Sequence, residues 1–322
     1  MSDRTPRPAR GSPPRTCRRA TCALAALLCA TSARAEEGET VRHIADNSFL
    51  VEEAYNQEDG VVHNTASFVR DRDGGDWVTT VTQEWPVVNE EHQLSYTVVL
   101  SRVSDGNAVT TGVGDLQLGY RYQLLSDDAP FTVAPRLSAI LPTGDGAKAM
   151  GFGGYGVQVN LPASVEVTSW LVSHTNAGMT WVPRGRVRGE DVELRSYTAG
   201  EGLVVRLHPR FNLLVETLFT RSEVASGGAT SRTHALTVSP GFQTAFNFAN
   251  GLQVVTGLGV PLGVGPSAGS LSVLGYLSFE FPFTEAGKLN APAGPVRSRP
   301  PVRAVTPGRG DGEPDDAVAS GP

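Results

Sequence analysis

The chain has 322 residues, a formal net charge of −6 and 40% hydrophobic residues. Its N-terminal 35 residues hold seven arginines and one aspartate, so their removal would change the formal charge to −12. An acidic mature chain argues against nucleic acid as a partner, because phosphate backbones bind basic surfaces. No stretch approaches the roughly eighteen consecutive apolar residues of a membrane-spanning helix, so a membrane form of this protein would have to be a closed β-barrel.

Residues 1–35 have the pattern of an export signal. An arginine-rich start precedes an apolar stretch from Ala20 to Ala30, and Ala33-Arg34-Ala35 gives the small-x-small pattern of a cleavage site. We expect cleavage after Ala35. All three cysteines, Cys17, Cys22 and Cys29, lie in this segment, so we expect neither a disulfide nor thiol chemistry in the mature protein.

Residues 36–60 follow and are expected to remain in the periplasm or to plug a barrel. Asn47–Tyr55 within them would be a thirteenth strand, but bacterial single-chain barrels have even strand numbers, so we do not expect Asn47–Gln57 to span the membrane. We therefore predict a non-spanning element there, such as a short helix capped by Asn47 or Ser48. It would plug or line the periplasmic mouth, and its candidate plug residues are Asn47, Phe49, Glu52, Glu53 and Tyr55.

Residues 61–283 show the alternation of β-strands. The clearest run places Leu116, Leu118, Tyr120, Tyr122 and Leu124 on one face, opposite Gln117, Gly119, Arg121 and Gln123. Such runs reach ten or more residues, which suits tilted transmembrane strands better than the strands of soluble proteins. We predict an antiparallel outer-membrane barrel of about twelve strands. A secreted β-sandwich remains the alternative.

The links between these strands differ in length. Residues 183–191, 222–231 and 261–269 read as long links, and 208–210 and 249–251 as short ones, which is typical of outer-membrane barrels. One predicted strand, 195–207, places Arg195 and Glu201 on its apolar face. We interpret Gly200 and Gly202 as a bulge that switches the faces there. Residues 284–322 lack periodicity and are predicted to be a disordered periplasmic tail.

Most charged residues within the strands fall on the polar face. A lipid-facing arginine at mid-depth would cost about 2 to 4 kcal/mol, so the lumen is their expected location. The candidate pore-lining residues are Glu84, Arg121, Arg136, Arg206, Glu216 and Glu280. They could line a small pore or form salt bridges that fill a narrow barrel.

Few residues suggest catalysis. Gly151, Gly153 and Gly156 match a nucleotide-binding spacing, but a strand pattern rather than a helix follows them. Ser173 and His174 are neighbours on one strand and should point to opposite faces, so they cannot form a nucleophile–base pair by themselves. No histidines or carboxylates have metal-ligand spacing. We predict no enzymatic activity, no metal and no cofactor.

Two motifs carry a resemblance to a known family. The run 112–122, Gly-Val-Gly-Asp-Leu-Gln-Leu-Gly-Tyr-Arg-Tyr, and the run 141–145, Leu-Pro-Thr-Gly-Asp, resemble the outer-membrane proteins labelled as the MetA pathway of phenol degradation or putative transporters. The resemblance covers residues 61–283. It implies a barrel with a role in the uptake of hydrophobic or aromatic compounds. The tail beyond Phe283 departs from this family, whose barrels end at a terminal aromatic residue.

The leading functional prediction is therefore a passive channel for small hydrophobic or aromatic compounds in the bacterial outer membrane. A non-conducting structural or adhesive barrel is the alternative, and a barrel hydrolase a more distant one. The expected partners are outer-membrane lipids, small hydrophobic solutes and the barrel-assembly machinery.

Overall fold

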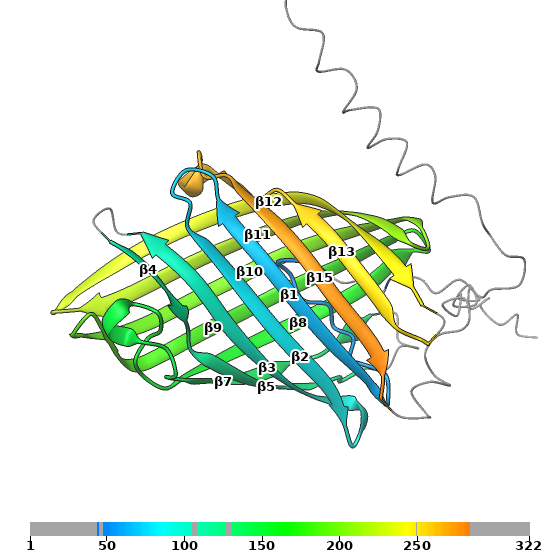
Figure 1. The fold of residues 1–322 in the computed structure, drawn as a ribbon, viewed down its shortest axis with the longest axis horizontal. Coiled ribbons are helices and arrows are strands. Elements are labelled where there is room, and N and C mark those ends of the chain that lie inside the picture. Colours follow the sequence, from blue (N-terminus) through cyan, green and yellow to red (C-terminus); the bar gives the residue numbers. More distant parts are fainter. Residues whose placement is uncertain (1–43, 45–47, 105–107, 126–130, 249, 284–322) are drawn as a thin grey trace, which may run out of the picture. The chain divides into compact units, whose positions relative to one another are not determined.

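The computed structural model describes residues 44, 48–104, 108–125, 131–248 and 250–283. The predicted export signal, Asn47 and the predicted C-terminal tail lie outside these residues. Within them the chain consists almost entirely of β-strands, which Figure 1 shows wrapped around an interior. No helix in the described part of the chain is both long enough and apolar enough to span a membrane.

The strands follow one another along the chain with two short 3-10 helices between them. The elements are β1 (Val61–Asp71), β2 (Trp77–Val87), β3 (Asn89–Ser104), β4 (Val109–Val113), β5 (Leu116–Tyr122), β6 (Thr132–Val133), β7 (Arg136–Leu141), η1 (Gly146–Lys148), β8 (Gly156–Thr168), β9 (Leu171–Val187), β10 (Glu190–His208), β11 (Phe211–Ser226), β12 (Ala229–Asn247), β13 (Gln253–Gly259), β14 (Leu262–Val264), η2 (Gly265–Ser267) and β15 (Ser272–Pro282).

These strands form a closed antiparallel barrel. β4 and β5 share one position beside β3, β6 and β7 share one beside β8, and β13 and β14 share one beside β12. The fifteen described strands therefore fill twelve positions, which confirms the predicted barrel. Closure joins β1 to β15 in continuous register from Val61 opposite Pro282 to Asp71 opposite Ser272.

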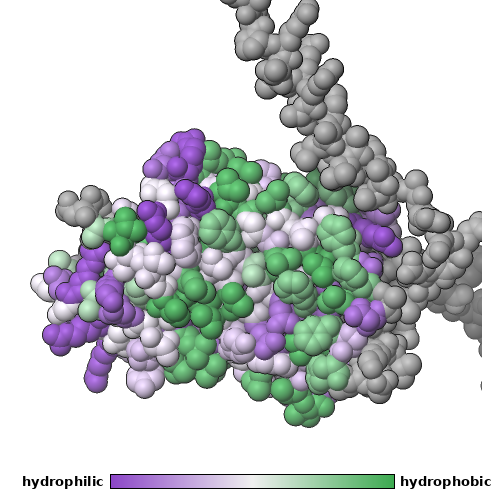
Figure 2. Space-filling view, in the orientation of Figure 1, coloured by the Kyte–Doolittle hydropathy of each residue, from purple (hydrophilic) through white to green (hydrophobic). Residues whose placement is uncertain are grey.

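Side chains alternate between a lumen and an outer surface. On β5, Tyr120 is 41% exposed and the next residue, Arg121, only 3%. The outward side chains are mainly apolar, among them Leu118, Leu203 and Phe242. Figure 2 shows apolar surface across the middle of the visible face, with polar residues gathered toward the ends of the strands. A polar interior within an apolar outer belt is the arrangement of a bacterial outer-membrane barrel, and the protein lies in that membrane.

Two links predicted to be long are tight turns. Only Arg188 and Gly189 separate β9 from β10, and only Gly227 and Gly228 separate β11 from β12. These four strands have 17, 19, 16 and 19 residues, which exceeds the nine to eleven or so that a bilayer requires. They therefore continue beyond the lipid belt at the end that carries the longer loops, which is the extracellular end.

The two motifs that carry the family resemblance meet in space. Both carboxylate oxygens of Asp115 accept backbone hydrogen bonds, from Gly144 at 3.0 Å and from Phe152 at 2.7 Å. The Thr143 hydroxyl accepts a hydrogen bond from the Leu116 backbone at 2.9 Å. These hydrogen bonds hold the Leu-Pro-Thr-Gly-Asp corner against the start of β5. The two motifs therefore stabilise the barrel wall at the end of β7.

The predicted bulge in β10 is wrong. The register of β10 with β9 and β11 is continuous through Gly200 and Gly202. Both glycines face the lumen, where a Cβ atom on Gly200 would lie 3.0 Å from Val51. They leave space in the lumen for the N-terminal segment, residues 48–60, rather than switch the faces of the strand.

Glu201 consequently lies on the outer surface. Its two carboxylate oxygens accept hydrogen bonds from the hydroxyls of Ser173 at 2.5 Å and Thr175 at 2.6 Å on the adjacent strand β9. Arg195, which also faces outward, pairs with Glu193 at 2.6 Å. Local polar partners therefore stabilise charges that strict alternation assigns to the lipid side.

Candidate functional site in the barrel lumen

The lumen contains all six charged residues that the alternation assigned to it. Arg121, Glu84, Glu216 and Glu280 are buried, whereas the side chains of Arg136 and Arg206 are 16% and 18% exposed. Five of them lie near one another or contact the N-terminal segment. Arg206 instead forms an ion pair with Glu166 at 3.3 Å, near the turn that joins β8 to β9. A role in lining a pore stays a prediction for all six.

The segment from Ser48 to Gly60 passes through this lumen. Ile44 is close to the β10–β11 turn, where its backbone N–H donates to the carbonyl of Pro209 at 3.0 Å. The segment then extends along the inner wall, shown in blue within the barrel in Figure 1, and leads into β1. The predicted short helix is wrong for residues 48–57, which have bends and no helical turn.

Glu216 of β11 anchors the segment. One oxygen of its carboxylate, Oε1, accepts hydrogen bonds from three consecutive backbone N–H groups, those of Phe49 at 2.9 Å, Leu50 at 2.8 Å and Val51 at 3.1 Å. Glu216 is fully buried. These bonds replace the local bonds of a helical turn, which explains why residues 49–51 are not helical although they follow possible capping residues.

Side chains of other strands bind four further backbone N–H groups of the segment. The N–H of Glu52 donates to Asn176 Oδ1 at 2.9 Å, that of Ala54 to Ser164 Oγ at 2.8 Å, that of Asn56 to Gln123 Oε1 at 2.8 Å and that of Gln57 to Gln93 Oε1 at 2.9 Å. The segment is therefore held to opposite sides of the barrel by hydrogen bonds and fills the space between them.

Arg121 is the main donor to the segment. Its guanidinium donates to Asn56 Oδ1 at 2.8 Å, to the Glu53 carbonyl at 3.2 Å and to the Tyr55 carbonyl. Arg136 on β7 forms an ion pair with Glu52. Two of the predicted lumen arginines therefore bind the predicted plug segment.

The candidate plug residues have different environments. Phe49 lies against the apolar part of the wall, Glu52 pairs with Arg136, and the ring of Tyr55 makes an edge contact with that of His174 at 6.1 Å. Burial raises the pKa of Glu53 to about 7, although nearby Arg121 opposes this rise. Asn47 lies outside the described residues.

A second set of charged side chains lies beside Glu53. His63 Nδ1 of β1 is 3.4 Å from Glu84 Oε2, and His63 Nε2 is 3.9 Å from Glu280 Oε1. His63 is only 2% exposed. The sequence did not single out His63, although its inward position on β1 opposite Glu84 and Glu280 was a signal that could have found it.

One side of the lumen is apolar. Val255 and Leu274 form a buried cluster with Tyr276, and Val172, Val204 and Leu214 form another; Phe49 packs against both. Alternation did not predict this part of the site, because its residues are apolar on a face expected to be polar.

Ser173 and His174 diverge as predicted. Ser173 faces outward to Glu201, and His174 faces the lumen, where its Nδ1 is 2.7 Å from the Ser164 hydroxyl. Ser164 also accepts the hydrogen bond from Ala54, and both Ser164 and His174 are buried. A substrate carbonyl therefore cannot approach this Ser–His pair while the segment is in place.

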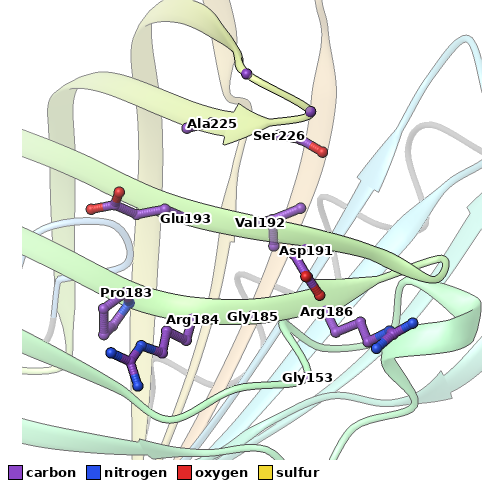
Figure 3. Close-up of a pocket in the computed structure, with 12 residues that line it drawn as sticks. Gly153, Pro183, Arg184, Gly185, Arg186, Asp191, Val192, Glu193, Ala225 and Ser226 are labelled. Atoms are coloured by element: carbon purple, nitrogen blue, oxygen red, sulfur yellow. The ribbon is translucent and has the colours of Figure 1, made fainter.

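A hollow of about 560 Å³ lies at the extracellular ends of β9, β10 and β11. Figure 3 shows Arg184 and Arg186 extending from β9, and Asp191 and Glu193 from β10. Its lining carries charges of both signs and no aromatic residue, so it suits a polar solute better than a hydrophobic one.

The comparisons identify relatives by structure alone. No family model and no curated protein matches the chain by sequence. An outer membrane channel from Pseudomonas putida F1 is similar in structure, with a TM-score of 0.60, 14% sequence identity, and coverage of 74% of this chain and 100% of that one. At this identity the likeness establishes the fold.

Two other solved barrels are less similar. The NanC porin has a TM-score of 0.46 at 12% identity, covering 68% of this chain and 98% of its own. The CymD monoaromatic hydrocarbon channel has a TM-score of 0.42 at 11% identity, covering 70% and 89%. The strand order of the described residues gives the barrel that the sequence motifs imply, whereas the family label attached to those motifs remains a resemblance.

Proposed function

We propose that the protein is a channel of the outer membrane for small hydrophobic or aromatic solutes, closed by its own N-terminal segment. The observation that carries the proposal is the way in which residues 48–57 are held. Their backbone is bound by side chains of the wall, with three N–H groups on one oxygen of Glu216. These contacts can separate without breaking any hydrogen bond between strands. The segment can therefore leave the lumen while the ring of paired strands stays intact.

The apolar inner wall supports the solute class. Most of the lumen is polar, but the side that Phe49 contacts contains Val172, Leu214, Leu274 and Tyr276. Ligand sites combine apolar walls with a few placed polar groups. The Pseudomonas protein of the same fold is named a channel, in agreement with this proposal.

The test is the conductance of a Glu216→Ala variant in planar bilayers. Removing the carboxylate leaves three N–H groups without their acceptor, and for the buried one, that of Val51, the cost is on the order of 1–3 kcal/mol. We expect the variant to open at least ten times more often than the wild type. Its folded state is checked by heat-modifiable migration on gels.

Glu166→Ala is the matched control. Glu166 also faces the lumen, but its ion pair is with Arg206. We expect it to open as rarely as the wild type, because Glu166 does not bind the N-terminal segment through this ion pair. A folded Glu216→Ala protein that is as silent as the wild type would contradict the channel and favour the non-conducting structural barrel.

The solute class is tested separately, with outer-membrane vesicles that contain the open Glu216→Ala variant. Faster passage of benzyl alcohol than of a sugar of similar mass would support a hydrophobic or aromatic solute, and equal passage would reject it.

A further inference from the structure

Phe49 occupies a niche with a floor of glycine. A Cβ atom on Gly257 would lie 2.5 Å from Phe49 Cζ, one on Gly241 would lie 2.9 Å from Cε2, and one on Gly259 would lie 3.3 Å from Cδ2. All three glycines are on β12 and β13 and face the lumen. Any larger residue at Gly241 or Gly257 would occupy the position of the ring, so the wall has a recess of the size of one aromatic ring.

The sides of the recess also suit an aromatic ring. The ring centroids of Phe49 and Tyr276 are 5.1 Å apart with the planes inclined at 34°, within the range of favourable aromatic pairs. Phe49 also packs against the buried cluster of Val172, Val204 and Leu214. We name the recess formed by Gly241, Gly257, Gly259 and Tyr276 the Phe49 niche.

Buried polar atoms without partners lie on the strand β12, which forms part of the Phe49 niche, and on its neighbour β11. Gln243 is fully buried, and within the described part of the chain neither its side-chain oxygen nor its nitrogen has a hydrogen-bond partner. It lies opposite Gly257 on one side and opposite Asn212 on the other. Asn212 Nδ2 and Ser239 Oγ likewise have no partner among the described residues, and Ser239 Oγ is 3.2 Å from the Cβ position of Gly259.

A phenylalanine ring cannot satisfy these atoms. A buried polar group without a hydrogen bond destabilises the folded state. A hydroxyl group can both donate to the oxygen of Gln243 and accept from its nitrogen or from Asn212. A ring that carries a hydroxyl would therefore fit the niche better than Phe49 does.

We propose that the Phe49 niche is a binding site for small hydroxylated aromatic compounds, and that Phe49 occupies it as an internal substitute for the ligand. The proposal rests on the channel function and specifies its solute. Because ligand and segment compete for one site, an arriving solute displaces the Phe49 ring and weakens the attachment of the segment.

The test is the binding of 4-fluorophenol to a Phe49→Ala variant of the full chain in detergent micelles, followed by ¹⁹F NMR. The substitution removes the ring but keeps the backbone N–H that binds Glu216. Apolar cavities of ring size bind aromatic molecules. We expect the variant to bind 4-fluorophenol at least ten times more tightly than the wild type, and fluorobenzene at least ten times more weakly than 4-fluorophenol.

Two double variants serve as a matched pair. In Phe49→Ala/Gly257→Ala the added methyl group occupies the position of the ring, so binding should fall at least tenfold. In Phe49→Ala/Gly275→Ala the new methyl group lies in open space one residue from Tyr276, so binding should persist. Equal binding by both double variants, or no binding to Phe49→Ala, would overturn the niche. Equal affinity for fluorobenzene would overturn the hydroxyl requirement.

The 4-fluorophenol binding test and the conductance test can fail independently of each other. Conductance of Glu216→Ala without 4-fluorophenol binding to Phe49→Ala leaves the channel and rejects the niche. Binding without conductance establishes the niche in a barrel that does not conduct, and rejects the channel.

Discussion

At the scale of the single residue, Glu53 makes the binding of the N-terminal segment in the lumen depend on pH. We call the segment seated when it lies in the lumen and released when it has left. The Glu53 side chain is partly buried against the barrel wall, and this burial raises its pKa from 4.5 to about 7. The titratable and charged groups that face it come from four strands, namely Arg121, Glu84, His63 and Tyr276. When the segment leaves the lumen, Glu53 becomes solvated and its pKa returns toward the ordinary value.

The released segment should therefore be favoured as the pH rises. Below about pH 4.5 Glu53 is protonated in both states, and the seated state has its full stability. Between about 4.5 and 7 Glu53 is ionised in the released state but still protonated in the seated state. The free energy that favours the seated state therefore falls with rising pH, by up to about 3 kcal/mol in total. Above 7 both forms are ionised and the effect is constant. Single-channel recordings from pH 4 to 8 should show openings that become more frequent across this interval.

Glu53→Gln isolates this contribution. The amide stays neutral, so the pH dependence between 4.5 and 7 should decrease and openings should stay rare at pH 7. Glu166→Gln, whose partner is Arg206, should keep the wild-type profile. An unchanged profile in Glu53→Gln would assign the pH response to other groups in the lumen.

Single residues also show what the sequence could predict. Alternation placed Arg121 and Glu216 in the lumen correctly because it depends only on neighbours along one strand. Their partners could not be found in this way: Arg121 binds Asn56 across 65 residues, and Glu216 binds Phe49 across 167. The helix predicted for this segment does not form for the same reason, since a distant side chain, that of Glu216, binds the N–H groups of residues 49–51 in place of a local cap.

At the scale of the element, alternation identifies strands only within the lipid belt. There the two faces differ in polarity, as in β5. Beyond the belt both faces meet water, and the extracellular parts of β9–β12 carry charges such as Glu193, Arg195 and Glu223 on their outer face. Those parts resembled loops in the sequence, which explains why residues 183–191 and 222–231 were predicted as long links.

The turn between β2 and β3 contains a strained residue. Val88 has a φ of +70° and is 96% exposed. A left-handed conformation costs an L-residue roughly 1–2 kcal/mol, and glycine adopts it without this cost. We expect Val88→Gly to raise the free energy of unfolding by about 1 kcal/mol, measured from the urea midpoint of Trp fluorescence in lipid vesicles. Val87→Gly, inside β2, should lower it, and a lower midpoint for Val88→Gly would exclude strain at this turn.

At the scale of the whole molecule, closure depends on β1 and β15. Their register extends over the whole of both strands and ends at Pro282. We expect a chain that lacks residues 284–322 to keep the heat-modifiable migration of the folded barrel. A chain that also lacks residues 272–283 should lose it, because β1 then has no partner on that side. Loss of the folded band on removal of 284–322 alone would show that these residues contribute to the barrel.

The attachment of Phe49, Leu50 and Val51 to Glu216 also bears on the order in which the barrel assembles. Closure joins strands separated by most of the chain, and the entropy of closing a loop increases with its length. Once the segment is bound to β11, β1 is tethered close to the C-terminal strands, and the loop to be closed shortens from about 200 residues to about 76, a saving of about 1 kcal/mol. The residues that obstruct the finished barrel should therefore act as its folding template, and Glu216→Ala should refold more slowly than the wild type.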